Sequence, residues 1–162
     1  SLARWRGEYY GLGRVFWYIQ PPLHVIPASF LLGFGPGQFG GGAVAALHNT
    51  SVYEKLDLPF GVFGTDGYID NNWFSLWGES GTVGMVFFLW MYIGFFLYAL
   101  RLSKTHEDPF VRALATGMCA IFIGITFNAF TSTFFEIRTN AFYVWLYAGF
   151  LYVLSQEKTK HL

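Results

Sequence analysis

Long stretches without a charged residue are the feature that most constrains this chain. No charge interrupts residues 82–100, and none interrupts residues 113–135. At a rise of about 1.5 Å per residue, helices of these lengths match a bilayer hydrocarbon core of about 30 Å. A third apolar run, residues 139–155, has the shortest length that can span. The sequence therefore predicts an all-α membrane protein with about three transmembrane helices over these ranges.

The composition excludes several other classes of protein. Of the 162 residues, 54% are hydrophobic and 12% are charged, whereas an ordinary soluble domain has about 25% charged residues. Ten Lys and Arg balance ten Asp and Glu, which excludes a basic nucleic-acid-binding protein. One cysteine, Cys119, cannot form an internal disulfide, and the four histidines lack metal-ligand spacing. We expect neither a metal ion nor a cofactor.

The distribution of Lys and Arg predicts the orientation. Residues 101–112 contain three of these residues and the tail, residues 156–162, contains two, whereas the connection between the second and third runs contains one, Arg138. Short cytoplasmic loops are enriched in Lys and Arg. We therefore expect residues 101–112 and the tail in the cytoplasm, and residues 1–81 on the outer side.

Residues 15–34 are also apolar, but they contain Pro21, Pro22 and Pro27. Proline disfavours a straight helix in lipid, so we expect an interfacial or re-entrant segment rather than a fourth span. Three spans and one large outer segment do not easily form a complete translocated protein. We therefore expect the C-terminal part of a longer polytopic protein.

The glycine-rich segment of residues 33–42 lies in the outer region. It lacks the preceding strand and the ribose-binding acid of a dinucleotide-binding fingerprint. Repeated glycines either permit positive φ angles in a chain reversal or leave backbone N–H groups free to bind an anionic oxygen. The reversal is favoured. Under the second interpretation Gly35 and Gly37 are candidate substrate-binding residues.

The segment of residues 70–84 leads into the first predicted span. Asp70 and the two asparagines that follow it are good N-cap residues for a helix that begins near Trp73. Two faces are expected on this helix, a polar one with Asn72, Ser75 and Glu79 and an aromatic one, suited to the membrane interface, with Trp73 and Trp77.

Gly78, Gly81 and Gly84 follow at intervals of three on the same helix. Small residues at this spacing let another helix approach closely. A helix cap and an interfacial aromatic belt explain the whole segment without catalysis, and this interpretation stays open beside a functional one.

The connection between the second and third runs contains Glu136 and Arg138. An arginine here either extends its head group to the membrane interface or faces the outer cavity and binds an anion, because guanidinium groups match phosphate oxygens. The second interpretation makes Arg138 a candidate substrate-binding residue.

Several motifs follow one another in a recognisable order: Gly13–Arg14 with Trp17, then Gly33–Phe39, then Asp70–Asn71 with Trp73, Trp77, Glu79, Gly81 and Gly84. This order resembles the C-terminal half of the O-antigen polymerase and O-antigen ligase family of bacterial membrane glycosyltransferases, over most of residues 11–100. The resemblance implies a multi-pass inner-membrane enzyme that needs no metal. It also implies that residues 1–81 form a periplasmic loop with short interfacial helices, acting on glycans carried by undecaprenyl diphosphate.

The resemblance also implies roles for individual residues. Arg14 would face the lipid-linked diphosphate. Asp70 stands where the ligase branch has a histidine, which favours the polymerase-like branch, with Asp70 as general base or orienting acceptor and Glu79 as the alternate carboxylate. Asn71, Asn72 and Trp73 are candidate substrate-binding residues, and Arg138 is added by position. The implied partners are the undecaprenyl-diphosphate-linked glycan, membrane lipid and a chain-length regulator protein.

Polymerase-like transfer to a sugar hydroxyl, as in O-antigen or exopolysaccharide synthesis, is the function that the sequence favours. Two alternatives stay open: ligase-type transfer to another acceptor, and a transporter or flippase segment without catalysis. The predicted spans are nearly free of ionisable residues, whereas translocation sites often have them near mid-bilayer. This difference favours chemistry at the outer boundary.

Overall fold

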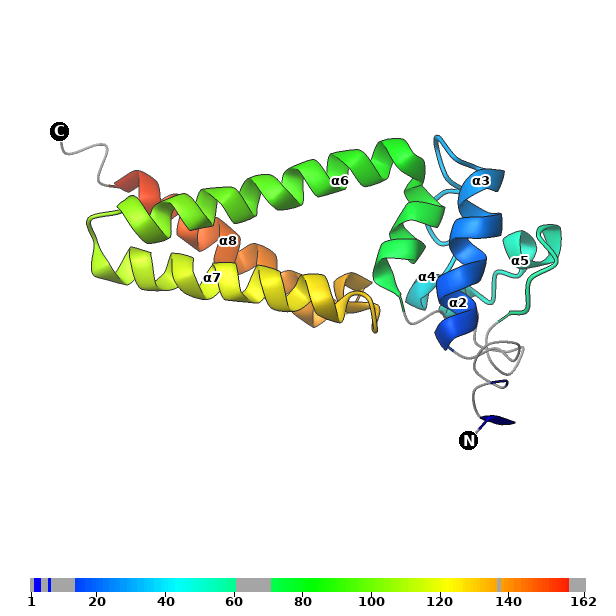
Figure 1. The fold of residues 1–162 in the computed structure, drawn as a ribbon. Coiled ribbons are helices and arrows are strands. Elements are labelled where there is room, and N and C mark those ends of the chain that lie inside the picture. Colours follow the sequence, from blue (N-terminus) through cyan, green and yellow to red (C-terminus); the bar gives the residue numbers. More distant parts are fainter. Residues whose placement is uncertain (1, 4–5, 7–13, 61–70, 137, 158–162) are drawn as a thin grey trace.

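The computed structural model describes residues 2–3, 6, 14–60, 71–136 and 138–157 (Figure 1). Over these ranges the chain is helical and has no strand, which confirms the all-α prediction. The elements are α2 (Arg14–Gln20), the π-helical segment η1 (Pro21–Val25), α3 (Ile26–Ala28), α4 (Gly41–Leu47), α5 (Ser51–Lys55), α6 (Asn72–Thr105), α7 (Pro109–Asn128), the 3-10 turn η2 (Phe134–Glu136) and α8 (Arg138–Glu157).

The three long helices α6, α7 and α8 run back and forth along one axis (Figure 1). The α6–α7 connection and the C-terminal end of α8 lie at one end, and the short helices α2 to α5 lie at the other. This is the arrangement of ends that the pattern of Lys and Arg predicts. The side of the membrane that each end faces stays a prediction.

Two of the long helices in the described part of the chain, α6 and α7, are long and apolar enough to cross a membrane. The residues of the third predicted span do form a helix, α8, but this helix does not pass the same test. Its tyrosines and its polar ends lower the mean hydropathy of the helix. The structure therefore supports two candidate spans, and the third stays a prediction.

Helix α7 does not coincide with the second predicted span, residues 113–135, at either end. Helix α7 begins four residues earlier, because the carboxylate of Asp108 accepts a hydrogen bond from Phe110 N at 2.8 Å and Pro109 occupies the first helical position. It ends at Asn128, and the chain then turns before η2. A run without charged residues indicates an apolar environment, but it does not indicate where a helix begins or ends.

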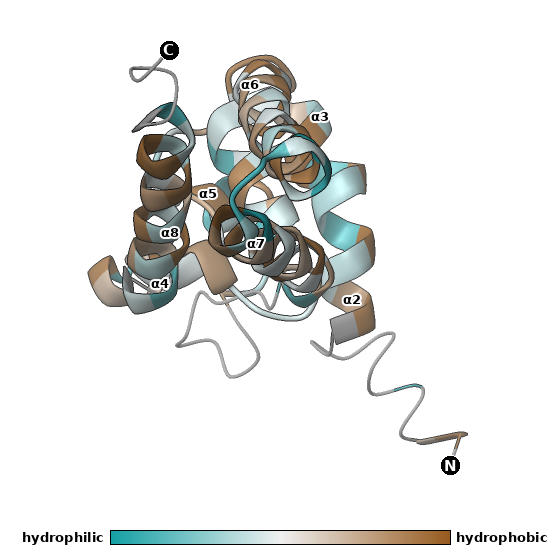
Figure 2. Cartoon of the chain, turned by 90° about the vertical axis from the view of Figure 1, so that its left-hand side faces the viewer, coloured by the Kyte–Doolittle hydropathy of each residue, from teal (hydrophilic) through white to brown (hydrophobic). Residues whose placement is uncertain are grey.

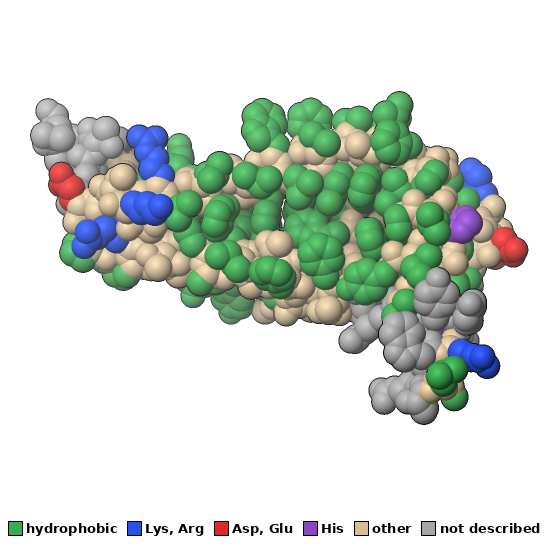
Figure 3. All heavy atoms as spheres, in the orientation of Figure 1, with side chains coloured by type: hydrophobic (Ala, Val, Ile, Leu, Met, Phe, Trp, Pro, Cys, Tyr) green, Lys and Arg blue, Asp and Glu red, His purple; other side chains and the backbone are tan. Residues whose placement is uncertain are grey.

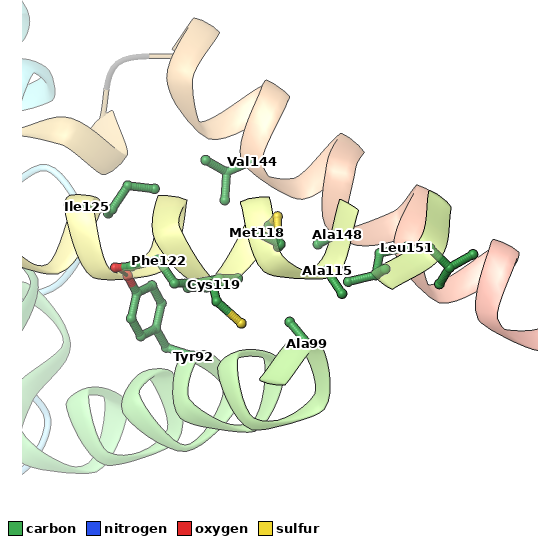
Figure 4. Packing of buried hydrophobic residues seen from close by; sticks show 11 residues of the cluster. Tyr92, Ala99, Ala115, Met118, Cys119, Phe122, Ile125, Val144, Ala148 and Leu151 are labelled. Carbon is green, nitrogen blue, oxygen red and sulfur yellow. Dashed lines mark hydrogen bonds between the residues drawn. The ribbon is translucent and has the colours of Figure 1, made fainter. Parts of the chain in front are cut away.

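Helix α7 lies between α6 and α8 and packs against both (Figure 4). Alanines from the three helices permit close packing, and the Tyr92 hydroxyl donates to Phe122 O at 2.7 Å. The buried cluster consists of Tyr92 and Ala99 from α6, Val111, Ala115, Met118, Cys119, Phe122 and Ile125 from α7, and Val144, Ala148 and Leu151 from α8.

The outer faces of the long helices are apolar as well. Of the most hydrophobic stretch, 11% is buried in α6 and 28% in α7, and Trp90 and Phe127 are 73% and 72% exposed. Figure 3 shows a hydrophobic band between charged ends, and Figure 2 shows hydrophobic residues along the outside of α8. A core helix of a soluble protein would be mostly buried. The pattern indicates membrane association.

Residues 14–28 are helical throughout, through η1 with its Pro21–Pro22 pair. Fifteen helical residues reach about 22 Å, less than the hydrocarbon core of about 30 Å. The segment runs across the axis of the long helices (Figure 1). It is therefore not a straight span, as predicted, and its interfacial location stays a prediction.

Candidate functional site

Helix α6 consists of two arms joined at Gly81. Asn71 caps its N-terminus, since the side chain accepts a hydrogen bond from Phe74 N at 3.0 Å. Gly81 has φ 66° and ψ −174°, which is not helical, and the helix axis turns sharply there (Figure 1). We call residues 72–80 the short arm and residues 82–105 the long arm. The predicted asparagine cap is confirmed for Asn71, whereas Asp70 lies outside the described residues.

The short arm begins against the turn that follows α7. Asn72 N donates to Ala129 O at 2.8 Å, and the Asn72 Oδ1 accepts from Phe135 N at 2.6 Å. Asn72 is buried. We call this region, residues 71–73 with residues 126–135, the junction. The Asn72 Oδ1 therefore binds the backbone of the chain, and the predicted substrate contact of Asn72 stays a prediction.

Trp73 fills the centre of the junction. Its indole N–H donates to Thr126 O at 3.2 Å, and its ring lies 5.8 Å to 6.2 Å from four other aromatic rings. With 7% of its surface exposed, Trp73 packs inside the protein and not on its surface, and its place at the depth of the membrane interface stays a prediction. Its ring contacts come from Phe88, Tyr92, Phe130 and Phe135.

Two further helices meet the same turn. The Tyr18 hydroxyl donates to Phe130 O, which brings α2 to the junction, and α2 begins at Arg14. Helix α8 begins at Arg138, three residues after Phe135. The backbone elements that carry Arg14 and Arg138 therefore converge where Asn71, the residue after Asp70, begins the short arm. The side chains of Arg14 and Arg138 are outside the described part, so their roles stay predictions.

The junction also contains an unpartnered donor that sequence reasoning did not reveal. Asn71 is 1% exposed, and its Nδ2 has no hydrogen-bond partner among the described residues. A buried donor without a partner costs about 1–3 kcal/mol, so such a group requires an explanation, for instance a ligand that supplies the acceptor. Asn71 was predicted to bind substrate, and the structure leaves its amide available for that contact.

The glycine-rich segment forms a chain reversal, as favoured from the sequence. Five of its glycines have φ between 65° and 98°, the left-handed region that side chains disfavour. They are Gly33, Gly35, Gly37, Gly40 and Gly41.

This reversal closes over the break in α6. A helix that breaks leaves backbone carbonyl and N–H groups without partners, and residues 30–35 supply both kinds of partner. We call residues 30–37 together with residues 78–83 the clip. Its backbone hydrogen bonds are Phe34 N to Gly78 O at 2.9 Å, Gly35 N to Glu79 O at 2.9 Å, Thr82 N to Phe30 O at 2.8 Å and Val83 N to Leu31 O at 3.1 Å.

Glycine is required where the two segments of the clip, residues 30–37 and residues 78–83, touch each other. A Cβ at Gly33 would lie 2.2 Å from Glu79 O, and one at Gly81 would lie 2.3 Å from Leu31 O. A Cβ at Gly78 would meet the ring of Phe39 at 2.5 Å. Gly78 and Gly81 therefore admit a loop at the place where another helix was expected, and the expectation for Gly84 stays a prediction.

Glu79 belongs to the clip. Its Oε1 accepts a hydrogen bond from Gly37 N at 2.6 Å. The N–H groups of Gly35 and Gly37 thus bind Glu79 itself, and the interpretation in which they are free for a substrate anion is wrong for this structure. Glu79 lies seven residues, about 10 Å, along the short arm from Asn72. The structure separates it from the junction.

The polar face predicted for residues 72–79 is divided in the same way. Asn72 contacts the turn after α7, whereas the Ser75 hydroxyl donates to Phe39 O at 3.3 Å and Glu79 contacts the glycine segment. The two tryptophans do share a face. Both line an apolar groove of about 550 Å³ between the two arms of α6 and α7.

This groove has a volume in the range of small-molecule sites, about 300–1,000 Å³. Its walls are almost entirely apolar, and it runs along the long arm from the junction. Within the described residues no group of three or more His, Cys, Asp or Glu could hold a metal ion. The lining residues are Trp73, Phe74, Trp77, Met85, Leu89, Tyr92, Ile93, Phe96, Phe122, Ile123, Thr126, Phe127 and Phe130.

Comparison of the chain with protein-family models, with curated proteins and with solved structures finds no match. The resemblance to the O-antigen polymerase and ligase family therefore depends on the motifs in the sequence.

Proposed function

We propose that this protein is a membrane glycosyltransferase that moves a glycan from undecaprenyl diphosphate to a sugar hydroxyl. The observation that supports this most is the junction. Helix α2, the short arm of α6 and the start of α8 meet at one turn, where Asn71 keeps a buried donor without a partner among the described residues. The elements that carry Arg14 and Arg138 are those that meet, and Asp70 precedes Asn71 in the sequence.

The proposed reaction needs positive charge and a base. The bond between the sugar C1 and the diphosphate oxygen breaks, and its electron pair stays on the diphosphate. Arg14, with Arg138, stabilises this growing negative charge in a site shielded from water. The acceptor hydroxyl oxygen forms the new bond to C1, and its proton goes to the Asp70 carboxylate. The donor amide of Asn71 orients an oxygen of the glycan or of the diphosphate.

The apolar groove provides a place for the carrier. It begins at Trp73, in the junction, and continues between the long arm of α6 and α7. A prenyl chain in this groove would place its diphosphate at the junction. The apolar groove would then surround the tail, and the polar groups of the junction would surround the head group. Carriers with a phosphorylated head and a long apolar tail are the class of substrate that fits both.

The cellular setting belongs to the same proposal. We propose that α8 is a third span, that residues 1–81 are periplasmic in the bacterial inner membrane, and that the tail after α8 is cytoplasmic. A chain-length regulator is the proposed protein partner.

Membranes that contain the protein, incubated with lipid-linked oligosaccharide, test the proposal. Elongation of the oligosaccharide on its carrier supports polymerase-like transfer. Transfer to a different acceptor indicates the ligase-type alternative. Uptake into sealed vesicles without any new glycosidic bond contradicts an enzymatic function and indicates transport.

A further inference from the structure

A hydrophobic turn follows α3 on the surface of the molecule. Phe30, Leu31 and Leu32 are consecutive, and they are 52%, 62% and 75% exposed. Single exposed apolar residues are common on soluble proteins, but three large ones in a row are an unfavourable surface in water. We propose that this turn inserts its side chains into the lipid bilayer as a membrane anchor, which rests on the proposed membrane location of the protein.

The backbone of the turn is suited to lipid. In a bilayer, backbone polar groups need partners from the protein, because water is not available. Phe30 O and Leu31 O accept hydrogen bonds from the start of the long arm. Gly33 N donates to Ser29 O at 3.0 Å, and the Ser29 hydroxyl donates to Gly33 O at 2.6 Å. The carbonyl groups of Phe30 and Leu31 and both backbone polar groups of Gly33 are thus paired within the protein, while the side chains of residues 30–32 lie on the outside.

The position of the turn relative to the long arm determines how deep the turn lies in the bilayer. It is hydrogen-bonded to Thr82 and Val83, which begin the long arm, and it lies beside the bend of α6 (Figure 1). The charge-free residues from Thr82 to Leu100 reach about 28 Å, nearly the thickness of the hydrocarbon core. The turn therefore lies at the edge of the hydrocarbon, opposite the end with Arg101.

The surfaces next to the turn also indicate that lipid covers it. Val83, Val86 and Phe87, on the first turns of the long arm, are 43%, 58% and 61% exposed. They continue the apolar surface of the turn onto the candidate span without an intervening charge. One bilayer covers both surfaces.

Fluorescent labelling at single cysteines tests the anchor. The natural cysteine, Cys119, is buried and is replaced by alanine. Leu31→Cys then places an environment-sensitive dye on the turn, and its exposed position keeps the packing intact. Val86→Cys on the long arm is the matched lipid-facing site, and Ser51→Cys on α5 is the matched polar site. Each protein is reconstituted into vesicles of phosphatidylcholine and phosphatidylglycerol.

The dye at residue 31 is expected to lose fluorescence to lipids that carry a quencher high on the acyl chain, to be protected from aqueous iodide, and to emit at shorter wavelength than the dye at residue 51. Quenching by iodide at residue 31, with lipid contact at residue 86, overturns the anchor and leaves the membrane span intact. Iodide quenching at both sites contradicts the membrane location itself. Protection from iodide without lipid quenching means that protein, for example a second copy, covers the turn, and it also overturns the inference.

Discussion

The junction and the clip hold the two ends of the same short arm by different means. At the junction, side chains of Tyr18, Asn72 and Trp73 bind backbone groups of residues 126–135. The Asn71 amide there has no hydrogen-bond partner among the described residues. At the clip, four hydrogen bonds join backbone to backbone across the break at Gly81, and one joins Gly37 N to the Glu79 carboxylate. The hydrogen bonds of the clip stabilise the fold, whereas the junction has a buried donor without a partner among the described residues. This difference supports the proposal that the chemistry takes place at the junction.

The largest effect is expected from the charged residues assigned to the junction. Arg14→Ala should lower oligosaccharide elongation by about 10²–10³, the usual cost of removing a donor that stabilises transition-state charge. Asp70→Ala should lower it by about 10²–10⁴, as loss of a general base does. Arg14→Lys should also lose most activity if the phosphate contact is bidentate. Elongation is measured in membranes with equal amounts of each protein.

Arg101→Ala is the matched control for Arg14→Ala, because Arg101 lies near the end of the long arm, away from the junction. It should retain elongation. Normal product ladders from both Arg14→Ala and Asp70→Ala would remove these residues from the mechanism.

The clip should respond in stability. Gly33→Ala places a Cβ 2.2 Å from Glu79 O at φ 70°, so the backbone must shift. Positive φ at a non-glycine residue costs about 1–3 kcal/mol, and the overlap adds to this. We expect a lower thermal unfolding midpoint in detergent. Gly94→Ala is the control, since a Cβ there meets nothing within 4 Å, and alanine favours a helix by about 0.5–1 kcal/mol. Equal midpoints for the two variants would mean that the clip does not hold the bend.

Substitutions at Asn72 test how much the junction contributes to the stability of the protein. Asn72→Ala leaves the part-buried Phe135 N–H without its acceptor, which costs up to about 1–3 kcal/mol in the free energy of unfolding. Asn72→Asp keeps an oxygen at this position but buries a carboxylate, so it should restore part of that stability only at a pH low enough to protonate the carboxylate. The measurement is denaturant unfolding in detergent. An unchanged free energy for Asn72→Ala would show that the short arm does not depend on this contact.

The sequence reveals elements whose causes are local. The asparagine cap at residue 71, the glycine reversal and the shared face of Trp73 and Trp77 follow from neighbouring residues, and the structure has all three. The break at Gly81 has a distant cause. A glycine inside an apolar helix does not indicate a bend unless residues 30–35, some fifty positions earlier in the chain, are known to bind its backbone.

The same reason explains why the surroundings of Trp73 and Glu79 could not be predicted from the sequence. A tryptophan beside a predicted span is expected at the lipid interface, but Trp73 is enclosed by rings from α6 and from the turn after α7. A carboxylate near a candidate active site is expected to act there, but Glu79 faces Gly37. Both outcomes depend on contacts between segments distant in sequence, which neither spacing nor composition reports.

A substitution at Glu79 distinguishes most directly between the junction and the clip, and its expected effect on elongation is the smallest. Glu79→Gln keeps an Oε1 that can accept the Gly37 N–H and removes the ability to act as a base. If Glu79 is part of the clip, elongation should change by less than a factor of about 10, the equivalent of 1.4 kcal/mol, and the unfolding midpoint should stay nearly constant. If it is the catalytic carboxylate, elongation should fall by about 10²–10⁴ at unchanged stability. Glu79→Ala lacks the acceptor, so under the clip assignment it should lower the unfolding midpoint more than Glu79→Gln does. A large loss of elongation in a stable Glu79→Gln protein would therefore move the chemistry from the junction to the clip.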